Sequence, residues 1–397
     1  MIKEEDLPEE WKIKSLSEVC DINPRKSEIK DLPDEETVTF LSMDAINDDG
    51  KIIKMEIKSL NEVYKGYTYF KKSDVIFAKI TPCMENGKGA IADIDTEIGF
   101  GSTEFYILRC NEDIIPEWIH CFLSLKSIRK IAEAKMTGSA GQKRVPNKFF
   151  NYIKIPLPPI EIQQKIVRIL ENAEKIKEWR LKADKLTNDY LKSLFMDMFG
   201  GPRDNSKSWD IVNFNEIAKI EKTSITPDSM FENSNYIGLE HIESETGCIL
   251  NIMTAKEAGL KSNKYVFDKE CVLYGKLRPY LNKVALPNFK GVCSTDILPI
   301  KSIEGKSNKY FIKFLLSHPY YIKKSTEMST GANLPRISFK AIEKFKVYSP
   351  PIELQNQFAE IVKNVETLKN YQKQSKVQID NLFKNLMQKA FKGELTC

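Results

Sequence analysis

Three residues near the start of the chain have the types that a metal-dependent nuclease uses. Asp34 follows Pro33, and Glu56 and Lys58 lie further along the same half of the chain. Carboxylates can hold a divalent cation, and a nearby lysine can stabilise charge on a phosphate. The pattern is weak, because 29% of the residues are charged and such combinations arise easily. The second half of the chain has no equivalent, so we expect a binding protein rather than a catalyst.

The sequence contains none of the common motifs for catalysis or cofactor binding. It has no glycine-rich phosphate loop, no G-x-S-x-G, no H-E-x-x-H and no Asn/Asp-Pro-Pro-aromatic box of amino-methyltransferases. The eight cysteines include no C-x-x-C pair, and none of the three histidines is spaced for metal beside a cysteine. We therefore expect reduced thiols, no metal site and no cofactor in this chain.

Composition is that of a folded protein without a strong charge. The chain has 397 residues, of which 42% are hydrophobic, and its formal net charge is +5. The length favours two or three domains. A charge this close to balance does not by itself indicate nucleic-acid binding. The first residues lack a signal-peptide pattern and no apolar run approaches membrane length, so we expect a cytoplasmic protein.

The chain repeats itself internally. Residues 158–163 read PPIEIQ and residues 350–355 read PPIELQ, 192 residues later. The segments before the two copies also match, in the pairs 11–19 and 209–217, 75–82 and 272–279, 101–105 and 293–297, and 137–145 and 330–337. A repeat of this length predicts two structural units of the same kind.

Each copy of the hexapeptide opens a run of about 40 residues without Gly or Pro. Apolar residues in these runs step by three and four, which is typical of a coiled-coil seam. The predicted seam consists of Ile162, Ile166, Ile169, Ala173, Ile176, Ala183, Leu186, Tyr190, Leu194 and Met198 in the first run and Leu354, Phe358, Ile361, Val365, Leu368, Ser375, Ile379, Leu382, Leu386 and Ala390 in the second. Since a globular segment separates the two runs, we predict that the helices pair antiparallel, with the globular units at opposite ends.

The segments upstream of the two helices predict α+β domains. Short β-type runs bounded by Gly, Pro, Asn and Asp alternate with one or two helical stretches, such as residues 118–125 and 311–317. We therefore predict a twisted sheet in each unit. The expected boundaries are residues 1–157 and 201–349 for the globular units, 158–200 for a central helix and 350–397 for a C-terminal helix.

The doubled architecture resembles the specificity (S) subunit of Type I restriction–modification enzymes. The resemblance is carried by the two Pro-Pro-Ile-Glu-x-Gln motifs and runs essentially end to end. Four further segments are similar to that family: LPEEW at residues 7–11, GSTEF at 101–105, FMDMFG at 195–200 and AFKGEL at 390–395.

The resemblance implies two target recognition domains that read a bipartite, asymmetric site on double-stranded DNA. It also implies two methyltransferase (M) subunits, which use S-adenosylmethionine to methylate adenine, and two restriction/translocase (R) subunits, which use ATP and Mg. The subunit of this family carries no chemistry itself, which agrees with the lack of catalytic motifs.

Within this resemblance, we expect the repeated loops to contact DNA, because base edges and phosphates are bound by polar and basic side chains. The expected residues are Lys79, Asn86, Lys88, Thr137, Lys143 and Arg144 in the first unit and Lys276, Arg278, Thr330, Asn333 and Arg336 in the second. Arg144 and Arg336 are the strongest candidates. The alternative is that each arginine pairs with a carboxylate of its own domain.

The ends of the helices carry four aromatic residues that are candidates for binding M subunits: Phe195, Phe199, Phe383 and Phe391. The alternative is that they only seal the ends of the helix pair.

Two other functions stay open at this stage. A non-catalytic coiled-coil adaptor with two protein-binding heads would have the same architecture. A nuclease using Asp34, Glu56 and Lys58 would need metal-dependent cleavage by this chain alone.

Overall fold

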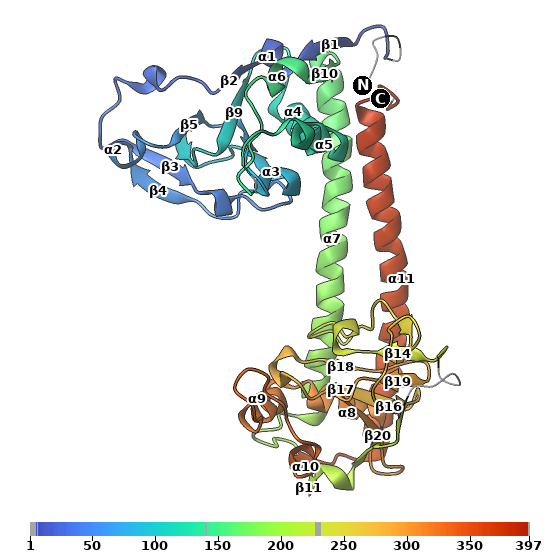
Figure 1. Cartoon of the computed structure of the whole chain (residues 1–397). Helices are drawn as coiled ribbons and strands as arrows, with labels where there is room; N and C mark the ends of the chain where they lie inside the picture. Colours follow the sequence, from blue (N-terminus) through green and yellow to red (C-terminus); the bar gives the residue numbers. More distant parts are fainter. Residues whose placement is uncertain (1–4, 6, 140, 227–231, 396–397) are drawn as a thin grey trace. The chain divides into compact units, whose positions relative to one another are not determined.

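The structure is a computed structural model that describes residues 5, 7–139, 141–226 and 232–395 (Figure 1). Ala140 of the first predicted DNA-contacting loop and Cys397 lie outside the described residues, as do residues 1–4 of the N-terminal segment. The chain divides into two compact units. Unit 1 contains Met1–Trp179 and Ser375–Cys397, and unit 2 contains Arg180–Gln374. Each unit therefore combines one globular domain with part of both long helices.

The two predicted long helices are confirmed. Helix α7 spans Ile160–Phe199 and helix α11 spans Ile352–Ala390. Both begin directly after a Pro-Pro pair. Proline is favourable there, because the backbone N–H that it lacks would have no hydrogen-bond partner within the helix. Gly200, with φ of 75°, ends α7 in a left-handed conformation that suits glycine.

The helices run antiparallel inside each unit, as predicted. In unit 2, Thr187 contacts Gln372, and Phe195, further along α7, packs on Phe358, earlier in α11. In unit 1, Lys177 of α7 lies 4.4 Å from the ring centroid of Phe383 in α11. The order of these contacts reverses along the two helices.

The predicted apolar seam is correct only in part. Its members Ile166, Ala173 and Phe358 are buried, but six others are more than one-third exposed: Ile169, Ile176, Leu186, Tyr190, Leu368 and Leu382. Buried Val167 and Leu170 belong to the core of unit 1. The helices thus bury one face against a globular domain as well as against each other, which broadens and shifts the apolar stripe.

The globular domain of unit 1 contains two four-stranded sheets and one strand pair. The first sheet has the order β2 (Cys20–Ile22), β9 (Phe105–Cys110), β6 (Val75–Ala78), β7 (Gly89–Ile91). The second has the order β4 (Glu56–Ser59), β3 (Thr37–Leu41), β8 (Ile98–Gly101), β5 (Thr68–Lys71), with β3 and β8 parallel. Strand β1 (Lys12–Ser15) pairs antiparallel with β10 (Lys154–Leu157), just before α7.

The globular domain of unit 2 repeats this topology with one additional strand, β13 (Ser224–Ile225), at the edge of its second sheet. Its first sheet has the order β12 (Ala218–Ile220), β20 (Ile297–Ser302), β17 (Cys271–Gly275), β18 (Val284–Ala285). Its second has the order β13 (Ser224–Ile225), β16 (Lys264–Phe267), β19 (Gly291–Cys293), β14 (Asn235–Ile237), β15 (Met253–Thr254), with β14 and β19 parallel. Strands β11 (Ile211–Asn213) and β21 (Lys346–Tyr348) form the strand pair. The α+β prediction is confirmed, but each domain has two main sheets where one was expected.

Helices cover these sheets at corresponding places. The predicted amphipathic helices are α4 (Pro116–Ser124) and α8 (Lys309–Leu316), and each is followed by a second helix, α5 (Lys126–Lys135) or α9 (Pro319–Glu327). The shorter helices are α1 (Leu16–Val19), α2 (Leu60–Val63), α3 (Cys83–Asn86), α6 (Phe149–Tyr152) and α10 (Phe339–Glu343), with the 3₁₀ turns η2 (Lys26–Ile29), η3 (Met43–Ala45), η4 (Phe214–Glu216), η5 (Leu239–His241) and η6 (Pro279–Leu281). None of the helices in the described part of the chain has the length and apolar character needed to cross a membrane.

The repeated glutamine of the hexapeptide fastens α7 to its domain. Gln163 is fully buried, and its side-chain oxygen accepts a hydrogen bond from the backbone N–H of Ile115 at 3.0 Å. Its amide nitrogen donates to the carbonyl oxygens of Asp113 and Pro158, at 2.9 and 2.8 Å. One side chain thereby satisfies three backbone groups between β9 and the start of α7.

Gln355 does the same in unit 2. Its oxygen accepts from the backbone N–H of Asn308 at 3.2 Å, and its nitrogen donates to the carbonyls of Lys306 and Pro350 at 3.1 and 2.8 Å. The repeated motif is therefore a device that fixes where each long helix leaves its domain.

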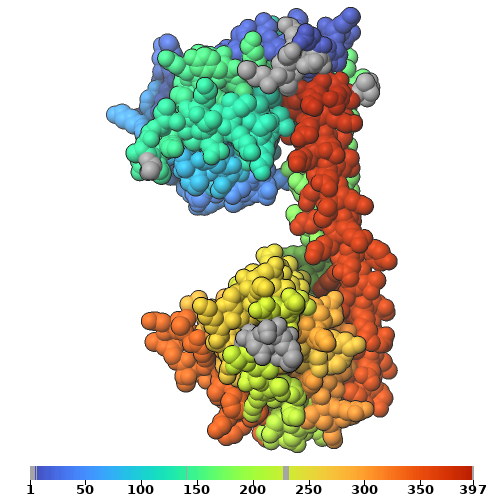
Figure 2. Space-filling view, turned by 45° about the vertical axis from the view of Figure 1, so that its right-hand side comes forward, coloured from blue at the N-terminus to red at the C-terminus, as the bar shows by residue number. Residues whose placement is uncertain are grey.

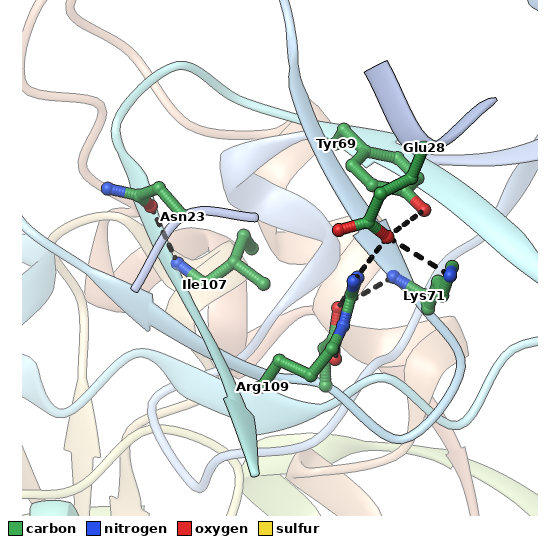
Figure 3. Close-up of polar contacts among 7 residues, drawn as sticks. Asn23, Glu28, Tyr69, Lys71, Ile107 and Arg109 are labelled. Carbon is green, nitrogen blue, oxygen red and sulfur yellow. Dashed lines mark hydrogen bonds and ion pairs between the residues drawn. The ribbon is translucent and has the colours of Figure 1, made fainter. Parts of the chain in front are cut away.

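A charged cluster joins the two sheets of unit 1 (Figure 3). Arg109 of β9 donates to both carboxylate oxygens of buried Asp74, at 2.9 and 2.8 Å, and to Glu28 of η2 at 2.6 Å. Lys71 and the hydroxyl of Tyr69, both on β5, also reach Glu28, at 3.0 and 3.4 Å. Burial alone would raise the pKa of Glu28, but the hydrogen bonds from Lys71 and Arg109 outweigh it and the pKa is lowered. The cluster thus holds η2, β5 and β9 together.

Candidate nucleic-acid interface

The first repeated loop is closed by its own backbone. Thr137 and Arg144 exchange two backbone hydrogen bonds, at 2.8 and 3.0 Å, which close the loop at its base. Gly138, with φ of 126°, is required here, because a Cβ atom would lie 2.8 Å from the carbonyl oxygen of Gln142. The loop is also joined to the end of β6, where Val145 N donates to Lys79 O at 2.9 Å.

Arg144 forms an ion pair with a carboxylate of its own domain. Its Nε lies 2.9 and 3.1 Å from the two oxygens of Glu104, and its Nη2 lies 2.8 Å from Oε1. The hydrogen bond from Arg144 lowers the pKa of Glu104, even though burial opposes this shift. Glu104 itself is held by a turn in which its N–H donates to Ser102 Oγ at 3.2 Å. The GSTEF motif thus supplies the acid that fixes the arginine.

The second loop repeats this geometry. Thr330 and Arg336 exchange backbone hydrogen bonds at 2.9 and 3.0 Å, and Ile337 N donates to Lys276 O at 3.0 Å. Arg336 Nε lies 2.9 Å from Asp296 Oδ1, and Nη2 lies 3.2 Å from Oδ2. The hydrogen bond with Asp296 raises the pKa of Arg336.

Both arginines direct most of their donors inward. Besides the carboxylates, Arg144 Nη1 donates to Gln142 O at 3.2 Å, and Arg336 Nη1 lies 3.5 Å from Leu334 O. Their side chains are still about 42–43% exposed. The structure therefore shows the alternative that the sequence left open, in which each arginine pairs within its domain and shapes its loop. Contact with DNA by these arginines stays a prediction.

The remaining predicted residues fall into two groups. Thr137, Lys143, Thr330 and Asn333 are exposed on the two loops, and Arg278, with φ of 51°, is exposed where β17 leads into η6. By contrast, Lys79, Lys88 and Lys276 are half-buried. Burial lowers the pKa of Lys79, whose ammonium lies 5.2 Å from the ring centroid of Tyr106.

Asn86 and Lys88, which were expected to contact DNA, lie at the end of a short helix. This helix is α3 (Cys83–Asn86), in which Met84 is fully buried. Asn86 is exposed at the end of α3, and Lys88 donates to the backbone of Met43 at 3.2 Å. Gly87, with φ of 91°, ends the helical turn here, and contact of Asn86 and Lys88 with DNA stays a prediction.

The four terminal aromatics do not form an exposed surface. Phe195, Phe199 and Phe391 are at most 2% exposed, and Phe383 is partly buried. Phe195 and Phe199 pack on Phe311 and Phe358 of their own unit. Their prediction as a docking surface is therefore corrected, because they seal the joint between helices and domain.

In the loose nuclease pattern, Glu56 and Lys58 lie on β4, whereas Asp34 lies in a turn before β3. Glu56 of β4 pairs with Lys54 at 2.8 Å and with Lys58 at 3.6 Å, and Lys58 lies 4.0 Å from the ring centroid of Phe40. Within the described ranges, no three His, Cys, Asp or Glu side chains gather as a metal site.

The acids that hold the arginines were missed from the sequence. Glu104 and Asp296 occupy the same place in the matching segments 101–105 and 293–297. In both copies the acid directly follows Ser-Thr, and this shared Ser-Thr-acid pattern was the available signal.

Comparison with known proteins agrees with the doubled fold. The family model described as "Type I restriction modification DNA specificity domain" matches residues 8–185 and again residues 206–381. The chain is 42% identical over 167 residues to the Type I restriction enzyme EcoAI specificity subunit of Escherichia coli, covering 41% of this chain and 28% of that protein. It is 30% identical over 257 residues to the EcoDI specificity subunit of the same organism, covering 61% of this chain and 55% of that protein.

These matches thus span about a quarter to about half of the length of the two relatives. A solved chain from a study of complex assembly and conformational transition of the type I R-M system has the same fold, with a TM-score of 0.64 over 98% of this chain and 99% of that one, at 21% identity.

Proposed function

Because the chain belongs to the family of Type I restriction–modification specificity proteins, we propose that it reads DNA sequence for such a complex and carries no catalysis itself. The observation that carries this proposal is the duplicated loop with its internal arginine–carboxylate pair. A loop that is held in place by backbone bonds and a bidentate ion pair can present its other side chains to base edges with little loss of entropy.

We further propose that the two domains read different half-sites. The first loop runs TGSAGQKR over residues 137–144, and the second runs TGANLPR over residues 330–336. The frame is retained, while the length and the exposed side chains change. Two domains that hold their loops in the same way but expose different side chains suit a bipartite, asymmetric DNA site.

The DNA proposal is tested by selecting duplexes from a random pool with the full chain and sequencing the bound fraction. We expect two unlike half-sites separated by an unselected spacer, with affinity that falls steeply as salt increases. A palindromic optimum would contradict the assignment of different half-sites. Binding without a salt dependence, or no binding, would instead favour the protein-binding adaptor.

We propose that the methyltransferase subunits dock on the exposed parts of the long helices. In unit 2, the apolar side chains Leu186, Tyr190 and Tyr371 are 51 to 66% exposed. In unit 1, Trp179, Val377 and Leu382 are likewise 51 to 67% exposed. The space-filling view shows much of α11 open to solvent (Figure 2). We infer that these exposed apolar side chains of α7 and α11 provide the contact surface for the M subunits.

Two such sets of exposed side chains, one in each unit, fit two M subunits for each chain. In this proposal S-adenosylmethionine is bound by the M subunits, and ATP and Mg²⁺ by two R subunits.

A further inference from the structure

Unit 1 contains an apolar groove that takes no part in the proposed DNA interface. It has a volume of about 1080 Å³ and lies between β1, α5, α6, β10 and the residues after α11. Its floor includes buried Ile128 and Ile153, and its open side includes Ile131 and Tyr152, which are 39% and 68% exposed. Apolar side chains left open to water around a concave surface indicate that something else covers them.

The two repeats differ at this place. Residues 116–138 align with 309–331, and 144–163 with 336–355, without gaps. Three positions of the groove, Ile128, Ile153 and Pro156, correspond in this alignment to Tyr321, Phe345 and Tyr348. The groove therefore exists where unit 1 has smaller side chains than unit 2.

In unit 2, the larger side chains fill the corresponding positions. Tyr321 and Tyr348 are each 1% exposed. The rings of Tyr321 and Phe345 stack with centroids 6.0 Å apart, and Tyr321 Oη donates to Lys346 O at 3.1 Å. Because larger side chains fill the corresponding positions of unit 2, the partner that occupies this groove can bind only once to each chain.

The edges of the groove carry mainly positive charge. Lys135, Lys154 and Lys392 line it together with one acid, Glu394, which lies 3.9 Å from Lys392. Across the described residues, neither Lys135 nor Lys154 forms an ion pair, and both are exposed. An apolar floor between two free lysines is complementary to an apolar stripe with acidic flanks.

We propose that this groove binds an amphipathic, acidic helix of a partner protein, with one helix for each chain. A helix presents an apolar stripe of residues spaced by three and four, and such a stripe can be laid into an apolar groove. A second copy of this groove is a poor occupant, because it would bring the two sets of lysines together. DNA is a poor occupant as well, because the floor offers apolar surface in place of hydrogen-bond donors.

The test uses the full chain and a fluorescein-labelled synthetic peptide of 18 residues, with leucines at helical spacing and glutamates beside them. Fluorescence anisotropy at low salt should show one peptide per chain. Ile128→Tyr combined with Ile153→Phe introduces the side chains of the second repeat and should weaken binding at least tenfold. A second variant, Ile131→Glu, changes an exposed position without altering the core and should weaken it as well.

Charge provides a matched control. Lys135→Glu combined with Lys154→Glu should abolish binding of the acidic peptide and allow binding of a peptide with lysine flanks. Lys346→Glu, at the position of unit 2 that corresponds to Lys154, should change nothing. Melting curves of each variant verify the fold.

Several outcomes would overturn the proposal. The proposal is contradicted if the peptide does not bind or if two peptides bind to each chain. It is also contradicted if both Ile131→Glu and the double variant Ile128→Tyr, Ile153→Phe bind the peptide as well as the unmodified chain. Dimers that dissociate when the groove is filled would assign it to a second copy of the chain. Loss of duplex affinity in the Lys135→Glu, Lys154→Glu variant, without any peptide binding, would assign it to DNA. If the unmodified chain does not bind DNA at all, the proposed function is contradicted, but the proposal for the groove is unaffected.

Discussion

Arg180 of α7 and Gln372 of α11 stand 192 residues apart, at equivalent positions of the two repeats, and they meet between the helices. With its amide oxygen turned toward the guanidinium, Gln372 accepts from Arg180 Nη2 at 2.9 Å and donates to Asp184 at 3.2 Å. Arg180 also pairs with Asp184 at 3.1 Å, and Gln372 is 8% exposed. A buried polar contact in a helix pair fixes the register of the two helices.

Replacing Gln372 with Ala should therefore destabilise the chain. The change removes the hydrogen bonds from Gln372 to Arg180 and Asp184, which still pair with each other and are 17% and 34% exposed. We therefore expect a loss near the lower end of about 1–3 kcal/mol. Urea denaturation followed by circular dichroism measures the loss, and we expect a lower midpoint for the unfolding of unit 2. Gln374→Ala, at an exposed position of the same helix, is the control. Equal midpoints for both variants would show that the polar contact does not stabilise the helix pair.

Gln163→Ala should loosen the joint between α7 and its domain. Three backbone groups lose their partner, and leaving buried groups unsatisfied costs about 1–3 kcal/mol. Faster hydrogen exchange at Ile115 and at the first turn of α7 reports the loss locally. Gln164→Ala, one residue further on and exposed, should have no effect. Exchange that stays slow in Gln163→Ala would remove the glutamine from this role.

The arginine–carboxylate pairs predict linked effects on DNA binding. Arg336→Ala and Asp296→Asn should both weaken duplex binding, by about 1–3 kcal/mol for a specific contact. Recognition should be lost at one half-site only, because unit 1 is unchanged. Glu304→Gln, at an exposed acid of the same domain, is the control. If Asp296→Asn binds normally while Arg336→Ala does not, the arginine contacts DNA directly and the carboxylate is dispensable.

The pH dependence of the first loop follows from Glu104. Its pKa is lowered from 4.5 by the hydrogen bond from Arg144. A carboxylate with a lowered folded pKa stabilises the fold above its ordinary value, and this contribution disappears as the pH falls through the folded pKa. The loop should therefore keep its geometry from pH 8 down to about pH 5 and lose it only in more acidic solution. An NMR titration of the Arg144 Nε–H signal that showed a transition between pH 5 and 8 would contradict this.

Asp74→Asn should be among the most damaging single changes in unit 1. Asp74 is 4% and Arg109 22% exposed in their side chains. Breaking a buried ion pair costs about 3–5 kcal/mol, and the partial exposure of Arg109 favours the lower end of this range. Chemical denaturation followed at the tryptophans of unit 1 measures the effect. The change Asp93→Asn, at an exposed acid of the same domain, should be close to neutral.

The sequence predicted the repeat and the long helices, because repeated motifs and apolar periodicity can be read directly along the chain. It predicted their antiparallel pairing because a globular segment separates the two helical runs. It did not predict the second sheet of each domain, because strands such as β13 and β15 have only two residues and depend on distant partners. It placed Arg144 and Arg336 in the right loops but missed Glu104 and Asp296, which lie 40 residues away in sequence. It also misjudged Phe195 and Phe199, since an aromatic at a helix end packs inward or outward according to a domain that the pattern does not reveal.

Phe391 stands near the end of α11 yet lies 4.3 Å, centroid to centroid, from Trp118 in the core of unit 1. Met387 and Ala390 belong to the same core. During synthesis, the domain that leaves the ribosome first consequently lacks part of its interior until residue 391 has been added. Nascent chains stalled before that residue should hold unit 1 in an incomplete state while unit 2 already has all of its residues.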